Sequence, residues 1–68
     1  MTATSGEVPL SGGHVFRWVL QGTTVPEVCG WVEKDHAVVT GTYGFYRTVD
    51  PQAAARIAAS NLGLELSQ

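Results

Sequence analysis

Hydrophobic and polar residues alternate along two stretches of the chain, His14–Gln21 and Glu27–Glu33. A period of two, with aromatic and β-branched residues at the apolar positions, is typical of strands that bury one face. In the first stretch the bulky residues share a face, so we expect a core built on Phe16, Trp18 and Leu20.

The second stretch does not show which of its faces is buried. Trp31 favours one face, whereas Val28 and Val32 favour the other. A shift of one residue in the pairing would exchange the two faces, so the pattern specifies the register only weakly. We place Trp31 in the expected core, together with Phe45 from the following segment.

The polar turn Lys34-Asp35-His36 predicts a hairpin that leads into a third strand from Ala37 to Thr48. This segment contains Gly41 and Gly44, and glycines inside a strand usually mark a bulge or a close approach of backbones. We expect one bent strand here, rather than two strands separated by a turn.

The period changes at Val49-Asp50-Pro51, which predicts the start of a helix. An aspartate can cap free backbone N–H groups, and proline suits the first helical position. Gly63 provides a left-handed stop, so we expect a helix over Pro51–Leu62. Its expected inward stripe comprises Ala54, Ile57, Ala58, Asn61 and Leu62.

Together these elements predict an α+β fold, a three-stranded antiparallel β-meander with one C-terminal α-helix packed on one face. The domain is expected over residues 14–68. Residues 1–13 are rich in Thr, Ser and Gly, and such a composition predicts a flexible N-terminal arm. The tail Leu64-Glu65-Leu66 either adds a short edge strand or lies on the surface.

A chain of 68 residues is small enough that its stability usually needs support from disulfides, a metal or a partner subunit. The single cysteine, Cys29, excludes a disulfide within the chain. With only His14 and His36 as further soft ligands, we expect no metal site and no cofactor. Association with a partner is the support that is left.

The formal net charge of −2 provides no long-range attraction to nucleic acid or to an anionic membrane. No apolar run approaches the ~20 residues of a membrane-spanning helix. We therefore expect a cytoplasmic protein with a reduced thiol. The abundance of Ala, Val, Gly and Thr suggests a bacterial or phage source.

A thiol nucleophile would need a base within hydrogen-bonding distance of Cys29 and a third group to orient that base. His36 could approach Cys29 across the hairpin, but a free cysteine is commonly just a small buried hydrophobic residue. The chain shows no oxyanion-hole motif, so we expect no catalytic residues and no enzyme activity.

The meander with one helix leaves one sheet face uncovered, and the pattern places valines on both faces. Such a surface is typical of a protein–protein interface. We therefore expect a small regulatory interaction module that binds a protein partner through an open sheet face or edge, most simply itself as a homodimer. The expected partner-binding residues are Arg17, Val28, Val32, Tyr43, Tyr46 and Arg47.

The alternative is a regulator that reads DNA with its sheet. In topology the expected fold is similar to ethylene-response-factor domains and to integrase arm-binding domains, which lay a three-stranded sheet in the major groove. That resemblance implies base contacts from strand arginines, here Arg17 and Arg47. The acidic Glu27 and Glu33 on the same strands, and the net charge, disfavour nucleic acid as a partner.

Overall fold

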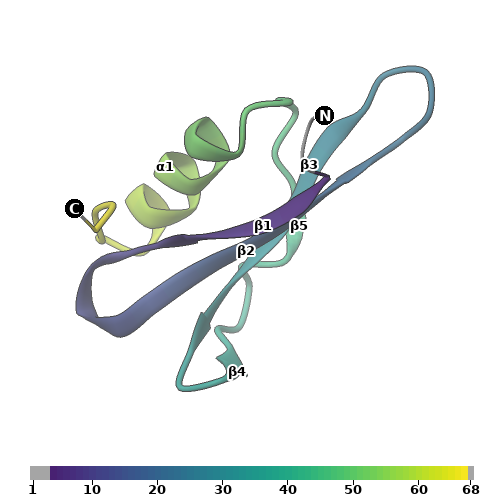
Figure 1. The fold of residues 1–68 in the computed structure, drawn as a ribbon. Helices are drawn as coiled ribbons and strands as arrows, with labels where there is room; N and C mark the ends of the chain where they lie inside the picture. The colour runs from purple at the N-terminus through teal and green to yellow at the C-terminus, as the bar shows by residue number, and fades with distance from the viewer. Residues whose placement is uncertain (1–3, 68) are drawn as a thin grey trace.

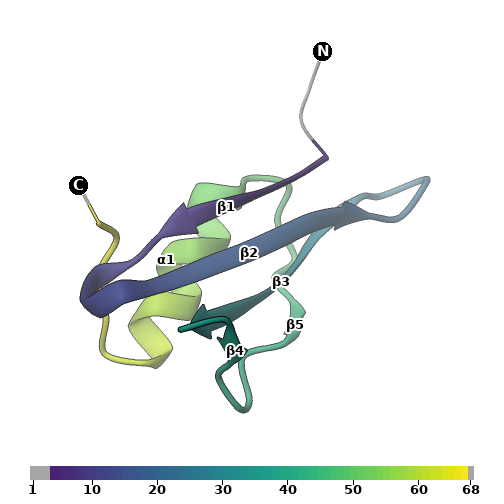
Figure 2. The ribbon, with the colours of Figure 1, turned by 60° about the horizontal axis from the view of Figure 1, so that its bottom comes forward.

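The structure is a computed structural model that describes residues 4–67. It contains strands β1 (Ser5–Pro9), β2 (His14–Gln21), β3 (Glu27–Lys34), β4 (Ala37–Val38) and β5 (Gly44–Phe45), a 3-10 turn (Ser11–Gly13) and helix α1 (Pro51–Asn61). The strands form one antiparallel sheet, in which β2 lies between β1 and β3 (Figure 1). Helix α1 covers one face of this sheet (Figure 2). The α+β class, the antiparallel meander and the C-terminal helix are confirmed.

Strand β1 corrects the expectation of a flexible arm. Ser5–Pro9 pairs with β2 along its whole length, and residues 1–3 lie outside the described part of the chain. Val8 falls opposite Phe16 and is only 7% exposed, and Leu10 is 3% exposed. A full backbone ladder and two buried aliphatic side chains compensate for the entropy of ordering this segment, although its composition is poor in apolar residues.

The pairing of β2 with β3 determines which side chains face the helix. Phe16 pairs with Val32, and Leu20 pairs with Val28. Residues directly opposite each other point to the same side of a sheet, so both valines join the core and are fully buried. Trp31, which was expected in the core, pairs with Arg17 on the other side.

The expected bent strand is divided into β4 and β5, which both pair with the same edge of β3. Between the two short strands, residues 39–43 lie opposite only Trp31 and Val32. The hydroxyl of Thr42 bridges this bulge: its Oγ1 accepts from the Val32 N–H at 3.0 Å and donates to the Val39 carbonyl at 2.7 Å. Because Thr42 is buried, this hydroxyl supplies the buried Val32 N–H with its acceptor.

Helix α1 has the ends that the sequence predicts. The Asp50 side chain accepts a hydrogen bond from the Gln52 N–H at 3.0 Å. At the other end Gly63 adopts a φ of 72°, and the Leu64 N–H donates to the Ala59 carbonyl at 2.7 Å. This arrangement is a Schellman motif, which satisfies carbonyls of the last turn.

The helix packs on the sheet through small side chains. Ile57, which was expected to face inward, is 46% exposed. The alanines let the helix axis approach closely, so the bulk of the core comes from the sheet. The buried helix residues are Ala54, Ala55, Ala58 and Ala59.

The C-terminal tail adds to the edge of β1. Leu66 forms a bridge with Leu10, and the Ser67 N–H donates to the Pro9 carbonyl at 3.0 Å. Of the two possibilities for the tail, the structure shows the edge pairing.

The burial of Val8 predicts that β1 contributes to stability. Val8→Ala removes about two buried methyl groups, so it should lower the free energy of unfolding by roughly 2 kcal/mol, measured by urea denaturation. Val25→Ala is the matched control, because Val25 is 74% exposed in the β2–β3 loop. If the two variants have equal midpoints of urea denaturation, β1 does not unfold cooperatively with the rest of the domain.

The hydrogen bonds of the Thr42 hydroxyl predict that a substitution of nearly equal volume at this position lowers the stability strongly. Thr42→Val leaves the Val32 N–H without its acceptor, so it should cost about 1–3 kcal/mol of stability and lower the melting temperature. Thr40→Val, at an exposed position of the same bulge, should change the melting temperature little. If the melting temperature of Thr42→Val is no lower than that of Thr40→Val, the hydroxyl does not have the stabilising role assigned to it.

Candidate functional site

The sheet face away from α1 is uncovered among the described residues, and we call it the open face. Because strand side chains alternate, it carries the odd-numbered residues of β1, β2 and β3. The central row runs from Glu7 and Arg17 through Trp31 to Tyr43. The flanking rows hold Pro9, Val15, Glu33 and Val38 on one side, and Ser5, Val19, Cys29 and Phe45 on the other.

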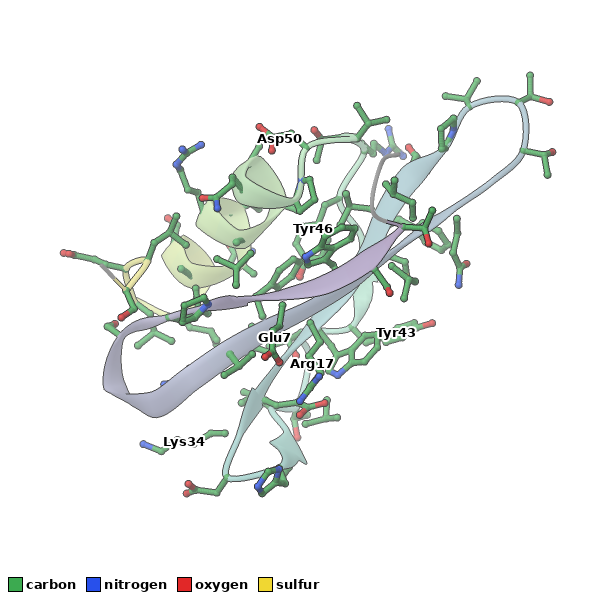
Figure 3. All side chains as sticks on the ribbon, viewed as in Figure 1. Glu7, Arg17, Lys34, Tyr43, Tyr46 and Asp50 are labelled. Carbon is green, nitrogen blue, oxygen red and sulfur yellow. The ribbon has the colours of Figure 1, made fainter. Side chains whose placement is uncertain are left out.

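One half of the open face is charged. The Arg17 guanidinium lies between two carboxylates, with Nη1 3.1 Å from Glu7 Oε2 and Nε 3.0 Å from Glu33 Oε1 (Figure 3). The register produces this arrangement, because Glu7 and Arg17 are direct cross-strand partners. The Trp31 Nε1–H donates to the other oxygen of Glu33 at 2.7 Å.

These contacts shift the ionisation of the two groups that share them. The hydrogen bond from Trp31 lowers the pKa of Glu33, and the hydrogen bond and charge of Arg17 act in the same direction. In turn, the hydrogen bond and charge of Glu33, with a smaller effect of Glu7, raise the pKa of Arg17. Both groups are therefore held in their charged forms.

The other half of the open face is aromatic. Trp31 and Tyr43 stack with ring centroids 5.8 Å apart and an interplanar angle of 25°. Tyr43 is 67% exposed and Phe45 is 55% exposed. We call Trp31, Tyr43 and Phe45 the aromatic ledge. Large aromatic side chains that remain exposed on a sheet face are typical of the apolar centre of an interface.

Cys29 lies beneath this ledge. It is fully buried, opposite Phe45 in the register. The hydrogen bond to Cys29 raises the pKa of Tyr43, and the charge of the thiolate adds to this effect. The thiol is therefore packed among the ledge side chains and is not presented to solvent.

Two of the expected partner-binding residues, Arg17 and Tyr43, lie on the open face (Figure 3). Val28 and Val32 do not, because the register turns them under the helix, where both are fully buried. Any surface contact of the folded chain must therefore be made without these two valines. This corrects the face on which the contact was expected.

The other two expected residues also lie apart from the ledge. The Tyr46 ring packs edge-on against Phe16, with centroids 5.3 Å apart, and its hydroxyl donates to the Thr42 carbonyl at 2.8 Å. Tyr46 is thus a partly buried core residue on the helix side (Figure 3). Arg47 is exposed just after β5 and has a φ of 53°.

Sequence reasoning did not assign four residues of the open face to the candidate site: Glu7, Trp31, Glu33 and Phe45. Glu7 lies in the segment that was expected to be a flexible arm, and Trp31 and Phe45 were expected in the core. The signal that could have found them is the parity of the register, since pairing Phe16 with Val32 puts Trp31 and Glu33 on the opposite side.

Comparisons with protein-family models, with curated proteins and with solved structures find no match to this chain. Within residues 4–67, no helix has the length and apolar character needed to span a membrane. Over the same residues, no three His, Cys, Asp or Glu side chains are grouped so that they could hold a metal ion. The exposed aromatic side chains and the ion pairs of the open face make it the candidate functional site.

The lowered pKa of Glu33 predicts an acid-dependent loss of stability. A carboxylate whose pKa is depressed by folding stabilises the protein above its unfolded pKa, and this contribution is lost as the pH falls through the folded value. Trp31→Phe removes the largest cause, so it should raise the pKa of Glu33, measured by NMR titration of the carboxyl carbon. Tyr43→Phe is the control. If the pKa of Glu33 is the same in the unchanged protein and in both variants, the hydrogen bond from Trp31 does not cause the shift.

Proposed function

We propose that this chain is a small non-enzymatic module that binds a protein partner through its open face. The observation that supports this most directly is the aromatic ledge, with Tyr43 and Phe45 each more than half exposed. Fully burying a side chain such as Phe is worth roughly 1.5–3 kcal/mol, and Phe45 is 55% exposed, so a partner that covers it gains about half of that free energy.

The layout of the open face also supports an interface. The aromatic ledge lies next to the ion pairs that Arg17 forms with Glu7 and Glu33. An apolar centre beside a polar rim is the common anatomy of protein interfaces, and aromatic and arginine residues are enriched there. The rim charges can orient a partner, while the ledge provides most of the affinity.

A second copy of the chain is the simplest partner to test, because it requires no other component. A homodimer made through this face would place the ledge in the contact, in a two-fold arrangement. The proposal includes a regulatory role in the cytoplasm of a bacterium or of a phage-infected cell, where the Cys29 thiol remains reduced.

No observation favours the alternative of a sheet that reads DNA. Arg17, the strand arginine on the open face, is already engaged by two carboxylates. To contact a phosphate or a base edge it would have to leave them, and the acidic groups would then face the DNA backbone. A salt-dependent gel shift with duplex DNA tests this alternative, and we expect no shift at physiological salt.

The proposal predicts that a crosslinker on the open face captures a specific protein. With benzoylphenylalanine in place of Tyr43, irradiation in the source cells should produce one discrete adduct, whose mass distinguishes a second copy from another protein. The same substitution at Ile57, which is 46% exposed on the helix, is the control and should produce none.

Adding Phe45→Ser to the Tyr43 crosslinking variant should abolish the adduct without unfolding the chain, because Phe45 is mostly exposed. Circular dichroism checks that the fold is retained. Equal adducts from Tyr43 and Ile57, or an adduct that survives Phe45→Ser, would contradict binding through the open face.

A further inference from the structure

The net charge of the chain is concentrated on the open face. This face holds Glu7, Glu27 and Glu33 against Arg17 alone. The three remaining acidic residues of the chain are matched by its three remaining basic residues, so the open face accounts for the whole formal charge of −2.

Glu7 has more capacity than Glu33 to bind a further cation. Both oxygens of Glu33 already accept hydrogen bonds, one from Arg17 and one from Trp31. The Glu7 side chain is 55% exposed, and among the described residues its one ion pair, to Arg17, uses Oε2. Since Glu33 also balances the charge of Arg17, the charge of Glu7 is in surplus.

A shallow hollow of about 480 Å³ brings this carboxylate together with Trp31 of the aromatic ledge. Its walls include Glu7, Arg17, Val19 and Trp31. A Lys or Arg side chain seated there would lie close to a carboxylate and to an indole ring, which both attract a cation. It would also lie close to the Arg17 guanidinium, whose positive charge the ion pair with Glu33 balances. The hollow is lined by side chains of β1, β2 and β3, whose register fixes their positions.

The charge of the open face argues against a second copy as the partner. In a two-fold dimer the surplus negative charge of one face would meet that of the other, which is unfavourable. A basic segment would instead bring opposite charges together.

We propose that the open face binds a short, extended, basic segment of a partner protein. An apolar or aromatic side chain of the segment covers Tyr43 and Phe45, and a Lys or Arg of the segment occupies the hollow between Glu7 and Trp31. This inference rests on the proposed function and names the chemical class of the partner.

The test uses three fluorescein-labelled peptides that repeat Arg-Ser-Leu-Ser, Glu-Ser-Leu-Ser or Arg-Ser-Ser-Ser, which we call the Arg–Leu, Glu–Leu and Arg–Ser peptides. Residues two apart in an extended segment point to the same side, so the charged and the apolar side chains can both face the sheet. Fluorescence anisotropy should show binding of the Arg–Leu peptide, weaker binding of the Arg–Ser peptide and none of the Glu–Leu peptide. Binding should weaken as salt is added, because the cation contact is solvent-exposed.

Matched variants locate the binding site. Glu7→Gln should weaken Arg–Leu binding about threefold to fivefold, the effect of losing one exposed ion pair. Tyr43→Ser should weaken it as well. Glu65→Gln is the control, because it removes the same charge from the exposed tail and should leave the affinity unchanged.

The proposal is overturned if the Glu–Leu peptide binds as well as the Arg–Leu peptide, if Glu65→Gln matches Glu7→Gln, or if no peptide binds at near-millimolar concentration. If sedimentation shows a dimer that Tyr43→Ser dissociates, the open face binds a second copy of the chain, and the proposal is also overturned. If the Tyr43 crosslinker captures a protein but the basic peptide does not bind, only this inference fails. If neither occurs, the proposed function fails with it.

Discussion

The packing of the Phe16 ring against Gly30 is the contact on which both faces of the sheet depend. A Cβ at position 30 would lie 2.7 Å from the Arg17 carbonyl and would collide with the Phe16 ring, so only glycine fits there. With Phe16 over Gly30, β2 and β3 adopt the register that pairs Phe16 with Val32. The same register sends Trp31 to the opposite side, so a side chain at position 30 would disturb the pairing that builds both the core and the open face.

Much of the fold was predictable because its signals are local. Asp50 and Gly63 mark the ends of α1 through hydrogen bonds that their own residue types favour. Strand β1 was not predictable in this way, because its stability comes from pairing with β2 and from two buried side chains, Val8 and Leu10. The break between β4 and β5 likewise depends on one threonine hydroxyl, which has no signature in a hydrophobic pattern.

The candidate site was predictable only in outline. The pattern showed that one sheet face lacks a cover, and it identified Arg17 and Tyr43. It could not choose between Trp31 and the valines of β3, because the two choices differ by a single residue of register. The aromatic ledge and its ion pairs therefore became visible only with the strand pairing.

The tail that pairs with β1 also has a consequence for fibril formation. An outer strand with free N–H and C=O groups can template the stacking of identical chains. Here Pro9 has no N–H to offer, and Ser67 occupies its carbonyl. Glu7 adds a charge on the remaining stretch of the same strand. The tail and Pro9 thus leave fewer free backbone groups on the β1 edge for another chain to pair with.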